Sequence, residues 1–451
     1  MIIVLYVMDS LRPDFLSCYG YSKETSPNID RLAREGVLFE NAFAQSTWTR
    51  SSAASLLSST YPSVHGLISL KDHLPKAVPV VSEHLTKKDF KTVAFSTMAN
   101  VSSMFGFDRG FDHFVELFKE ETIKRKRKVV TPGRRPVCTS EDINDFLIPF
   151  LIENRNQSMF VFIWSIDTHN PYFHRDVGLA RFCSPSPEIW WAKDVEKMDT
   201  DSQLLHLREL YADMIYYNDH HLGRLVEALK ELGLFQECLF ILTSDHGEAF
   251  GEHGLKGHGN PPYEEQIRVP LIMKFPHSEF GGRNSALIQH IDVVPTILDY
   301  LEEKQERRLV QGRSLLSLIK RGQAVNDFVF AETRLKEKSP RYTAVRTKEF
   351  KYIETQPWRL TFHMSVPEIR SWVGWLINRP RFLYRLTGDE SEKVNLIKAE
   401  RETAGRFHSM VRGVIRKNRD LARGIQREKK PKIEMEDDVV KQLEALGYFE
   451  R

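Results

Sequence analysis

Asp245 and His246 are adjacent residues whose side chains can bind one metal ion together. A carboxylate and an imidazole are hard-to-borderline ligands for a metal ion. The pair directly follows the apolar run at residues 239–242, which is typical of a buried parallel strand. Ligands of open α/β sheets bind at the carboxyl ends of the strands. The sequence therefore predicts part of a metal site at this strand end, although a polar loop with surface histidines would give the same local pattern.

Other reactive side chains also follow expected elements. Asp9 and His169 each come after an apolar run. Thr49 stands just before the small-residue helix expected at residues 51–58. The free N–H groups at a helix start favour an anion and a deprotonated hydroxyl. The neighbouring hydroxyls are alternatives to Thr49: Ser46, Thr47 and Ser51.

Together these side chains could carry out nucleophilic displacement on a tetrahedral anion. A metal ion held by Asp9, Asp245 and His246 could bind the Thr49 oxygen, lower its pKa and make it a nucleophile at neutral pH. Two imidazoles and helix N–H groups would hold the oxygens of the anion. These imidazoles are His169 and His258. The loop that carries His258 has five glycines between residues 247 and 259, which let its backbone approach a ligand closely.

The elements that must position these residues alternate along the first 335 residues. Expected strands cover residues 2–7, 37–44, 92–96, 159–164, 239–242 and 269–273, and expected helices cover 28–35, 51–58, 80–88, 140–154, 204–232 and 293–300. This alternation predicts an α/β domain with a mostly parallel sheet flanked by helices, residues 1–335. A hairpin at 342–353, a strand at 382–386 and a helix at 439–448 predict a smaller C-terminal α+β subdomain with an antiparallel sheet, residues 336–451.

Composition narrows the class of protein. The 451 residues carry a formal charge of only +3, which gives no general reason to expect a nucleic-acid partner. The basic run KRKRK at residues 124–128 is most simply a solvated loop, with docking to an anionic polymer or membrane as the alternative. The four cysteines have no paired spacing, and no apolar run reaches membrane-spanning length. We expect a soluble cytoplasmic protein and make no prediction of its oligomeric state.

Segments in order along nearly the whole chain carry a family resemblance. They are IIVLYVMDSLRPDFLSCYGY, SPNIDRLAREGVLFENAFAQ, SLLSSTYPSVHG, TSDHGEAFGEHG, YEEQIRVPLI, HIDVVPTILD, GRSLLSLI, VRTKEFKYI, LYRLTGDESEKVNL and LEALGY. In this order they resemble the sulfatase family of the alkaline phosphatase superfamily. The resemblance implies a parallel sheet between helices, a small C-terminal antiparallel sheet, and Thr49 as nucleophile with Asp9, Asp245 and His246 as metal ligands.

The chain departs from the family pattern at the nucleophile. Sulfatases carry Cys or Ser there, which is oxidised to formylglycine, and Thr49 cannot undergo this change. The arginine that follows in sulfatases is replaced by Ala53, with Arg50 as a possible substitute. Ser10 and His246 stand where the family has further oxygen ligands, so we expect one divalent ion, zinc or manganese rather than calcium. A threonine nucleophile with two Asp ligands, a His ligand and a further His downstream resembles the pattern of the phosphoethanolamine-transferase and phosphodiesterase branches of the superfamily.

The leading hypothesis is therefore a metal-dependent hydrolase of sulfate or phosphate esters, phosphate mono- or diesters being favoured, through a covalent intermediate on Thr49. The alternatives are a transferase that passes the group to a sugar or lipid, and a catalytically silent binding protein. Further substrate-binding candidates are Arg50, Asn100 and Lys256. The substrate would be a small-molecule, glycan or lipid ester. Its specificity pocket would draw on residues 175–200 and 355–381, whose tryptophans also suit simple packing.

Overall fold

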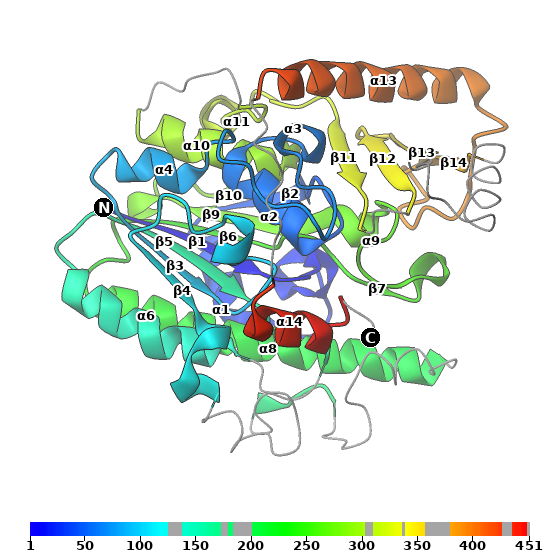
Figure 1. Cartoon of the computed structure of the whole chain (residues 1–451). Coiled ribbons are helices and arrows are strands. Elements are labelled where there is room, and N and C mark those ends of the chain that lie inside the picture. The colour runs from blue at the N-terminus through cyan, green and yellow to red at the C-terminus, as the bar shows by residue number, and fades with distance from the viewer. Residues whose placement is uncertain are drawn as a thin grey trace.

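An eight-stranded sheet forms the centre of the computed structural model (Figure 1). The structure describes residues 1–124, 138–172, 179–183, 201–302, 310–335, 339–356, 379–425 and 435–448. The strands lie in the order β10-β2-β9-β6-β1-β5-β3-β4. They are β1 (Ile2–Met8), β2 (Val37–Phe43), β3 (Lys91–Ser96), β4 (His113–Glu116), β5 (Met159–Ser165), β6 (Cys238–Thr243), β9 (Arg268–Lys274) and β10 (Gly282–Gln289). Strand β9 runs antiparallel to β2 and β6, and the other described pairs in this sheet are parallel.

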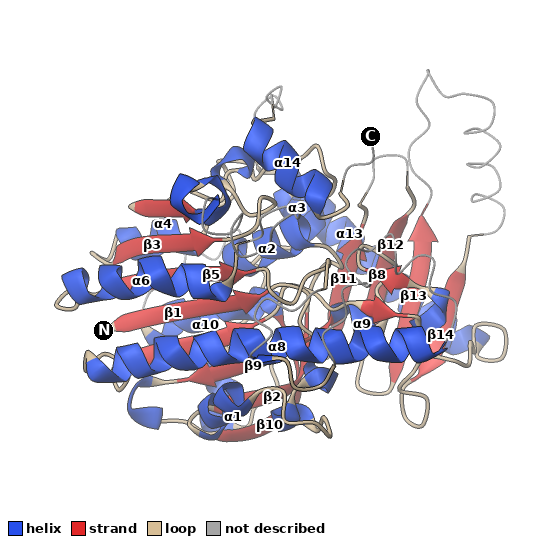
Figure 2. Ribbon diagram, turned by 90° about the horizontal axis from the view of Figure 1, so that it is seen from below, coloured by secondary structure: helices blue, strands red, loops and turns tan. Residues whose placement is uncertain are grey.

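Helices cover both faces of this sheet (Figures 1 and 2). One face carries α1 (Pro27–Arg34), α6 (Ser140–Asn154) and α8 (Asp201–Glu231), and the other carries α2 (Thr49–Ser58), α3 (Pro62–His65), α4 (Val81–Thr86) and α10 (Val293–Tyr300). The short helices α9 (Glu264–Ile267) and α11 (Leu316–Arg321) lie in connections. Because both faces are covered, a central strand such as β1 is buried at every residue and is apolar throughout.

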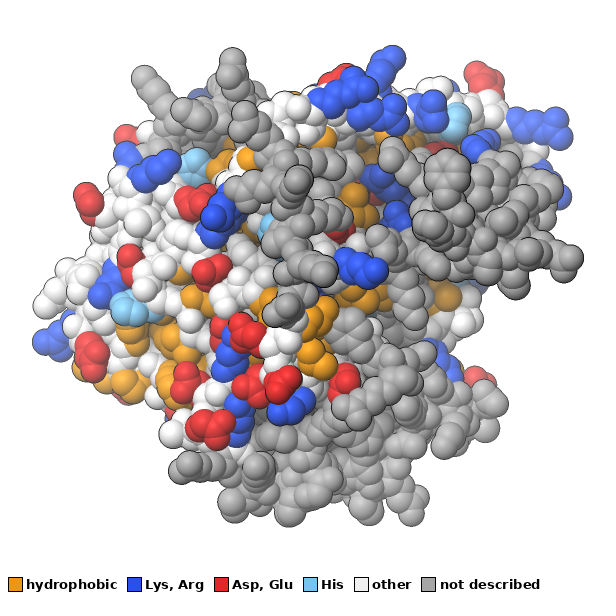
Figure 3. All heavy atoms as spheres, viewed as in Figure 1, with side chains coloured by type: hydrophobic (Ala, Val, Ile, Leu, Met, Phe, Trp, Pro, Cys, Tyr) orange, Lys and Arg blue, Asp and Glu red, His pale blue; other side chains and the backbone are white. Residues whose placement is uncertain are grey.

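The smaller sheet is antiparallel, in the order β11-β12-β13-β14. Its strands are β11 (Val329–Thr333), β12 (Arg341–Arg346), β13 (Phe350–Gln356) and β14 (Arg381–Arg385). Helix α13 (Arg401–Arg423) packs on it through the buried side chains of Phe407 and Val411. The opposite side of α13 exposes arginines and lysines, which lie along the upper edge of the view in Figure 3. The predicted α/β class with a second antiparallel sheet is confirmed.

The last described helix, α14 (Asp437–Ala445), packs against the main core rather than the smaller sheet. Its residues Val439 and Leu443 belong to the same apolar cluster as β1, β5 and β6. Lys124 forms a 3.0 Å ion pair with Asp438 at the start of this helix. The division of the chain at residue 335 stays a prediction. No helix in the described part of the chain has the length and apolarity needed to cross a bilayer.

The sequence analysis did not predict five strands, namely β4, β10, β11 and the two-residue strands β7 (Ala249–Phe250) and β8 (Lys256–Gly257). Strands β4 and β10 lie at the two edges of the main sheet, where only one side needs a hydrogen-bonded partner. The first four residues of β10 read GRNS and have no apolar side chain, so the hydrophobic pattern does not mark the strand. Several predictions fall outside the described residues: the role of residues 125–128, most of the 175–200 segment with Trp190 and Trp191, and the segment with Trp358, Trp372 and Trp375.

A buried ion-pair network joins the smaller sheet to helix α9, which directly precedes β9 of the main sheet. The ammonium of Lys351 on β13 lies 3.0 Å from Glu264 of α9 and 3.1 Å from Glu392, and the Lys351 side chain has no exposed surface. Burial opposes the charge on Glu264, but Lys351 and then Arg346 outweigh it and hold the pKa of Glu264 below its usual range. Burial and the nearby Glu264 raise the pKa of Glu392, against the opposing charge of Lys351.

Replacing Lys351 by Met should destabilise the fold by about 3–5 kcal/mol at pH 7, because it removes the cation that lies between two buried carboxylates and leaves Arg346 (3.5 Å) as the ion-pair partner of Glu264. Glu264, whose pKa is lowered, stabilises the wild type above its unfolded pKa of about 4.3 and loses this contribution as the pH falls. In the variant the pKa of Glu264 should rise and the already raised pKa of Glu392 should rise further, so the deficit of the variant should be smaller below about pH 5 than at pH 7. Urea unfolding at pH 7 and below about pH 5 measures the difference in unfolding free energy between the wild type and the variant. Lys348→Met, in the exposed turn before β13, is the control, and an equal deficit at both pH values would contradict the account.

Candidate active site

Asp9, Asp245 and His246 converge at the carboxyl edge of the main sheet. Their ligand atoms all lie within 4.8 Å of one another, and all three side chains are fully buried. The strand register brings them together: Met8 of β1 pairs with Ser165 of β5, and Val7 pairs with Thr243 of β6. Two residues beyond the second of these pairs, Asp9 lies level with Asp245. The structure thus brings together the three residues predicted as metal ligands.

The loop after β1 is tied to the loop after β6 by hydrogen bonds. The Ser10 amide donates to Asp245 Oδ1 (3.0 Å), and the Leu11 amide donates to Ser244 Oγ (2.7 Å). Asp9 Oδ2 accepts a hydrogen bond from the Trp164 indole (2.9 Å). These contacts fix both carboxylates before any ligand binds, which reduces the entropy cost of binding.

The electrostatics of the cluster fit a divalent cation. Burial, and then the charge of Asp9, raise the pKa of Asp245 well above its usual range. Asp245 Oδ2 is buried and makes no hydrogen bond with a described residue, while burial lowers the pKa of His246 and favours the neutral, metal-binding imidazole. Two carboxylate groups and one imidazole nitrogen form a donor set suited to zinc or manganese. A cation would offset the repulsion between the aspartates and coordinate Asp245 Oδ2, which lies 3.1 Å from Nε2 of the neutral His246 ring.

Thr49 reaches this cluster from α2, which covers the face of the sheet opposite α8 (Figure 1). It is the first residue of α2, after Trp48 in an extended conformation, so its hydroxyl lies at the helix start. Its Oγ1 atom is 3.2 Å from His246 Nε2. One helical turn later, Ser52 Oγ donates to the backbone oxygen of Asp245 and joins α2 to the loop that follows β6. The hydroxyl predicted as nucleophile therefore contacts a predicted metal ligand.

His169 and His258 lie next to the cluster. Their ring centroids are 4.8 Å apart, and the His258 ring lies 4.5 Å from that of His246. Burial lowers the pKa of His258, but the charge of Glu248 and a hydrogen bond to it outweigh this effect, and the pKa lies above its usual value. Burial lowers the pKa of His169. One imidazole is thus disposed to carry a proton and the other to remain neutral.

Two residues of the site were not predicted from the sequence. Glu248 is buried, lies 3.3 Å from His258 Nδ1 and accepts a 2.9 Å hydrogen bond from the Tyr172 hydroxyl. Tyr448 extends its hydroxyl to Thr49 from the last described segment of the chain. The DHGE sequence at residues 245–248 was a signal for Glu248, since it places a third ionisable side chain within three residues of Asp245. Tyr448 entered the sequence analysis only as the last residue of LEALGY, one of the segments that carry the family resemblance.

The substrate-binding candidates occupy two different environments. Arg50 donates to Asn100 Oδ1 (2.7 Å) and to the backbone oxygen of Leu70 (2.7 Å), and its guanidinium lies 3.3 Å from the centroid of the Phe105 ring. Burial lowers the pKa of Arg50 to about 9. Lys256 on β8 (Lys256–Gly257), which pairs with β7 (Ala249–Phe250), is exposed, whereas the central cluster is buried. Their roles in substrate binding stay predictions.

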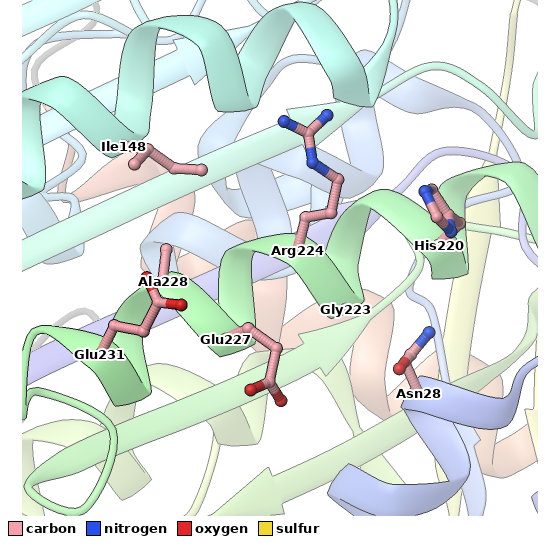
Figure 4. A pocket seen from close by; sticks show the side chains of 8 residues that line it. All are labelled: Asn28, Ile148, His220, Gly223, Arg224, Glu227, Ala228 and Glu231. Atoms are coloured by element: carbon pink, nitrogen blue, oxygen red, sulfur yellow. The ribbon is translucent and has the colours of Figure 1, made fainter.

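A separate hollow of about 440 Å³ lies where α8 passes α1 and α6 (Figure 4). Eight residues line it: Asn28, Ile148, His220, Gly223, Arg224, Glu227, Ala228 and Glu231. None of them belongs to the metal cluster or contacts Thr49 in the described structure. The hollow therefore takes no part in the chemistry considered below.

Two family models match this chain. The one described as sulfatase covers residues 2–303, and the one described as N-sulphoglucosamine sulphohydrolase, C-terminal, covers residues 251–363. Among curated proteins, an arylsulfatase of Clostridium perfringens is 24% identical over 413 residues, which cover 77% of this chain and 84% of the relative. An N-acetylgalactosamine-6-O-sulfatase of Bacteroides thetaiotaomicron is 22% identical over 509 residues, which cover 91% and 92%.

Solved structures share the fold. A phosphonate monoester hydrolase of Agrobacterium radiobacter superimposes with a TM-score of 0.71 at 19% identity, covering 92% of this chain and 95% of its own. A 2-O GAG sulfatase superimposes with a TM-score of 0.72 at 16% identity, covering 96% and 95%. The same fold therefore carries enzymes named for sulfate esters and for phosphonate monoesters.

Proposed function

The chain belongs to the sulfatase family and is an ester hydrolase of it, and from this premise we propose that it cleaves phosphate or sulfate esters through a covalent intermediate on Thr49. The observation that carries the proposal is the contact between the Thr49 hydroxyl and the cluster of Asp9, Asp245 and His246. A divalent ion bound by these three side chains would lower the pKa of the hydroxyl and offset the charge of the ester group.

In the proposed first step, Thr49 Oγ1, which has already released its proton to solvent, forms a bond to the phosphorus or sulfur atom while the bond to the leaving oxygen breaks; the same deprotonated oxygen is released again in the second step. His258, whose raised pKa favours the protonated ring, donates its proton to that oxygen. In the second step, neutral His258 takes a proton from water, the water oxygen attacks the Thr49 ester, and the threonine oxygen leaves. Glu248 holds the His258 ring and stabilises its charge. His169 lies beside His258 and would orient the oxygens of the bound group.

Phosphate is favoured over sulfate on chemical grounds. Threonine cannot form the formylglycine that releases sulfate by elimination, so the Thr49 ester must be broken by direct attack. Metal-assisted in-line attack suits phosphoryl groups. The phosphonate monoester hydrolases with this fold support that choice, whereas the arylsulfatase and N-acetylgalactosamine-6-O-sulfatase relatives support sulfate esters of aryl groups or glycans. The proposed metal is zinc or manganese. The four cysteines are scattered along the sequence with no paired spacing, which supports a reducing compartment such as the cytoplasm.

The proposed function is tested by turnover of nitrophenyl phosphate, bis-nitrophenyl phosphate and nitrophenyl sulfate, each with zinc, manganese or calcium. We expect release of nitrophenol from a phosphate ester with zinc or manganese, and a smaller rate with the sulfate. Added acceptor alcohols distinguish the second candidate: a transferase would give phosphorylated alcohol in place of inorganic phosphate. A protein that binds no divalent metal and turns over none of the three esters would contradict the proposal and favour a silent binding protein.

A further inference from the structure

The C-terminal segment of the described chain is anchored beside the active site. Gln442 of α14 donates to the backbone oxygen of Thr97 (2.7 Å) and accepts from the Ala99 amide. On the same helix, Val439 and Leu443 are fully buried in the main core, and Leu446 just after it is nearly so. Undocking α14 would expose these side chains to water, which is unfavourable. The segment is thus a fixed wall of the site.

The turn after α14 directs Tyr448 into the site. Gly447 has φ +81°, a left-handed conformation that costs glycine little and marks the end of many helices. The Tyr448 amide then donates to the backbone oxygen of Leu443 (3.0 Å), which closes the turn. In the sequence LEALGY, the leucines therefore attach the helix to the core, and the glycine reverses the chain so that the tyrosine points back toward the strand ends.

The Tyr448 hydroxyl lies among all three residues predicted to act on the ester group. It is 3.0 Å from Thr49 Oγ1, 3.0 Å from His258 Nε2 and 3.4 Å from His169 Nε2. Its oxygen lies between the nucleophile and the two imidazoles, the region in which an oxygen of a bound ester group must lie. A phenol is protonated at neutral pH, so the Tyr448 hydroxyl is a neutral hydrogen-bond donor.

We propose that Tyr448 is a substrate-binding residue, whose hydroxyl donates a hydrogen bond to an oxygen of the phosphate or sulfate group when the ester enters. This inference rests on the proposed function. The anchored helix keeps the ring at the site with or without substrate. When the ester enters, rotation about the two side-chain torsions of Tyr448 moves its hydroxyl away from the Thr49 oxygen. A neutral donor also suits an anionic group that the metal ion and His258 already partly neutralise. The C-terminal segment, distant in sequence from the metal ligands, thereby becomes part of the specificity pocket.

The test compares the wild type with Tyr448→Phe, which keeps the ring and removes only the hydroxyl. Isothermal titration of the metal-loaded proteins with inorganic phosphate and with sulfate measures binding without turnover, and steady-state kinetics on the best ester measure kcat/KM. Loss of a hydrogen bond to a charged group should weaken phosphate binding and lower kcat/KM by about tenfold to a hundredfold each. Tyr61→Phe is the matched control, because its buried hydroxyl donates to Gln289 (2.9 Å) in the apolar cluster beneath the smaller sheet and should leave both values unchanged.

Unchanged or tighter phosphate binding by Tyr448→Phe would overturn the inference, since the phenol would then only occupy the site and compete with the anion. Thermal unfolding of both variants checks that the fold is intact. If the wild type binds neither anion and turns over no ester, the proposed function fails and this inference fails with it. If the wild type binds and turns over normally while the variant matches it, the inference alone fails.

Discussion

Replacing Thr49 by Ala should abolish turnover of every ester that the wild type cleaves, by a factor of about 10⁴ or more, the scale seen when a nucleophile is removed. The change deletes the oxygen that forms the covalent bond. It leaves the backbone of α2 intact, because alanine is the best helix former and the Ser52 bond to Asp245 remains. Circular dichroism and thermal unfolding should therefore match the wild type. The rate is measured with the ester found in the substrate panel.

Two companion variants identify the oxygen responsible. Thr49→Ser keeps a hydroxyl at the same position and should retain part of the activity. Ser51→Ala, two residues later in α2, removes a buried hydroxyl that makes no hydrogen bond with a described residue, so it should be close to neutral in stability and rate. Wild-type turnover by Thr49→Ala, or loss of activity in Ser51→Ala alone, would contradict the assignment of Thr49.

Replacing Asp245 by Asn should remove tightly bound metal. Removal of a residue that only orients a metal ligand typically lowers metal affinity by about 10- to 100-fold. Loss of the ligand itself should lower metal affinity further. Elemental analysis of the purified protein should show about one metal ion per wild-type chain and far less in the variant. Asp14→Asn is the control, because the Asp14 carboxylate pairs with Arg12 (2.7 Å) and is half exposed, so metal content should not change.

The same substitution should reverse its effect on stability when metal is removed. In metal-free wild type, burial and then the repulsion from Asp9 oppose the ionised carboxylate of Asp245 and raise its pKa. The neutral amide of the variant relieves this repulsion. With chelator, Asp245→Asn should unfold at a higher temperature than wild type, and with saturating metal at a lower one, because the ion stabilises only a protein that binds it. A variant that is less stable than wild type under both conditions would show that the aspartate has a structural role alone.

The convergence of Asp9, Asp245 and His246 was predictable because it follows from a simple rule. Asp9 and Asp245 each come after a continuous apolar strand, and the ends of parallel strands meet at one edge of the sheet. No long-range information was needed beyond the adjacency of β1 and β6. Thr49 was harder to choose among nearby hydroxyls, and its selection required the family resemblance as well as its position before a helix.

Tyr448 could not be placed by the same reasoning. It is separated from Thr49 by 399 positions, and its direction depends on the turn at Gly447 and on the docking of α14 against the 97–99 loop. Residues in the periodic part of a helix show which face is buried, but not against which surface. Arg50 raised a related difficulty. Its type suggested an anion-binding group, whereas its guanidinium lies over Phe105 and bonds to Asn100, contacts that only tertiary structure reveals.

The central claim is that Asp9, Asp245 and His246 hold one divalent ion against the Thr49 oxygen. A crystal structure of the protein grown with manganese, with the ion located by its anomalous scattering, tests this most directly. The account predicts a single site in which the ion lies about 2.0–2.3 Å from an oxygen of each aspartate, from His246 Nε2 and from Thr49 Oγ1. An ion bound elsewhere, or one at this site with Thr49 Oγ1 beyond contact distance, would contradict it.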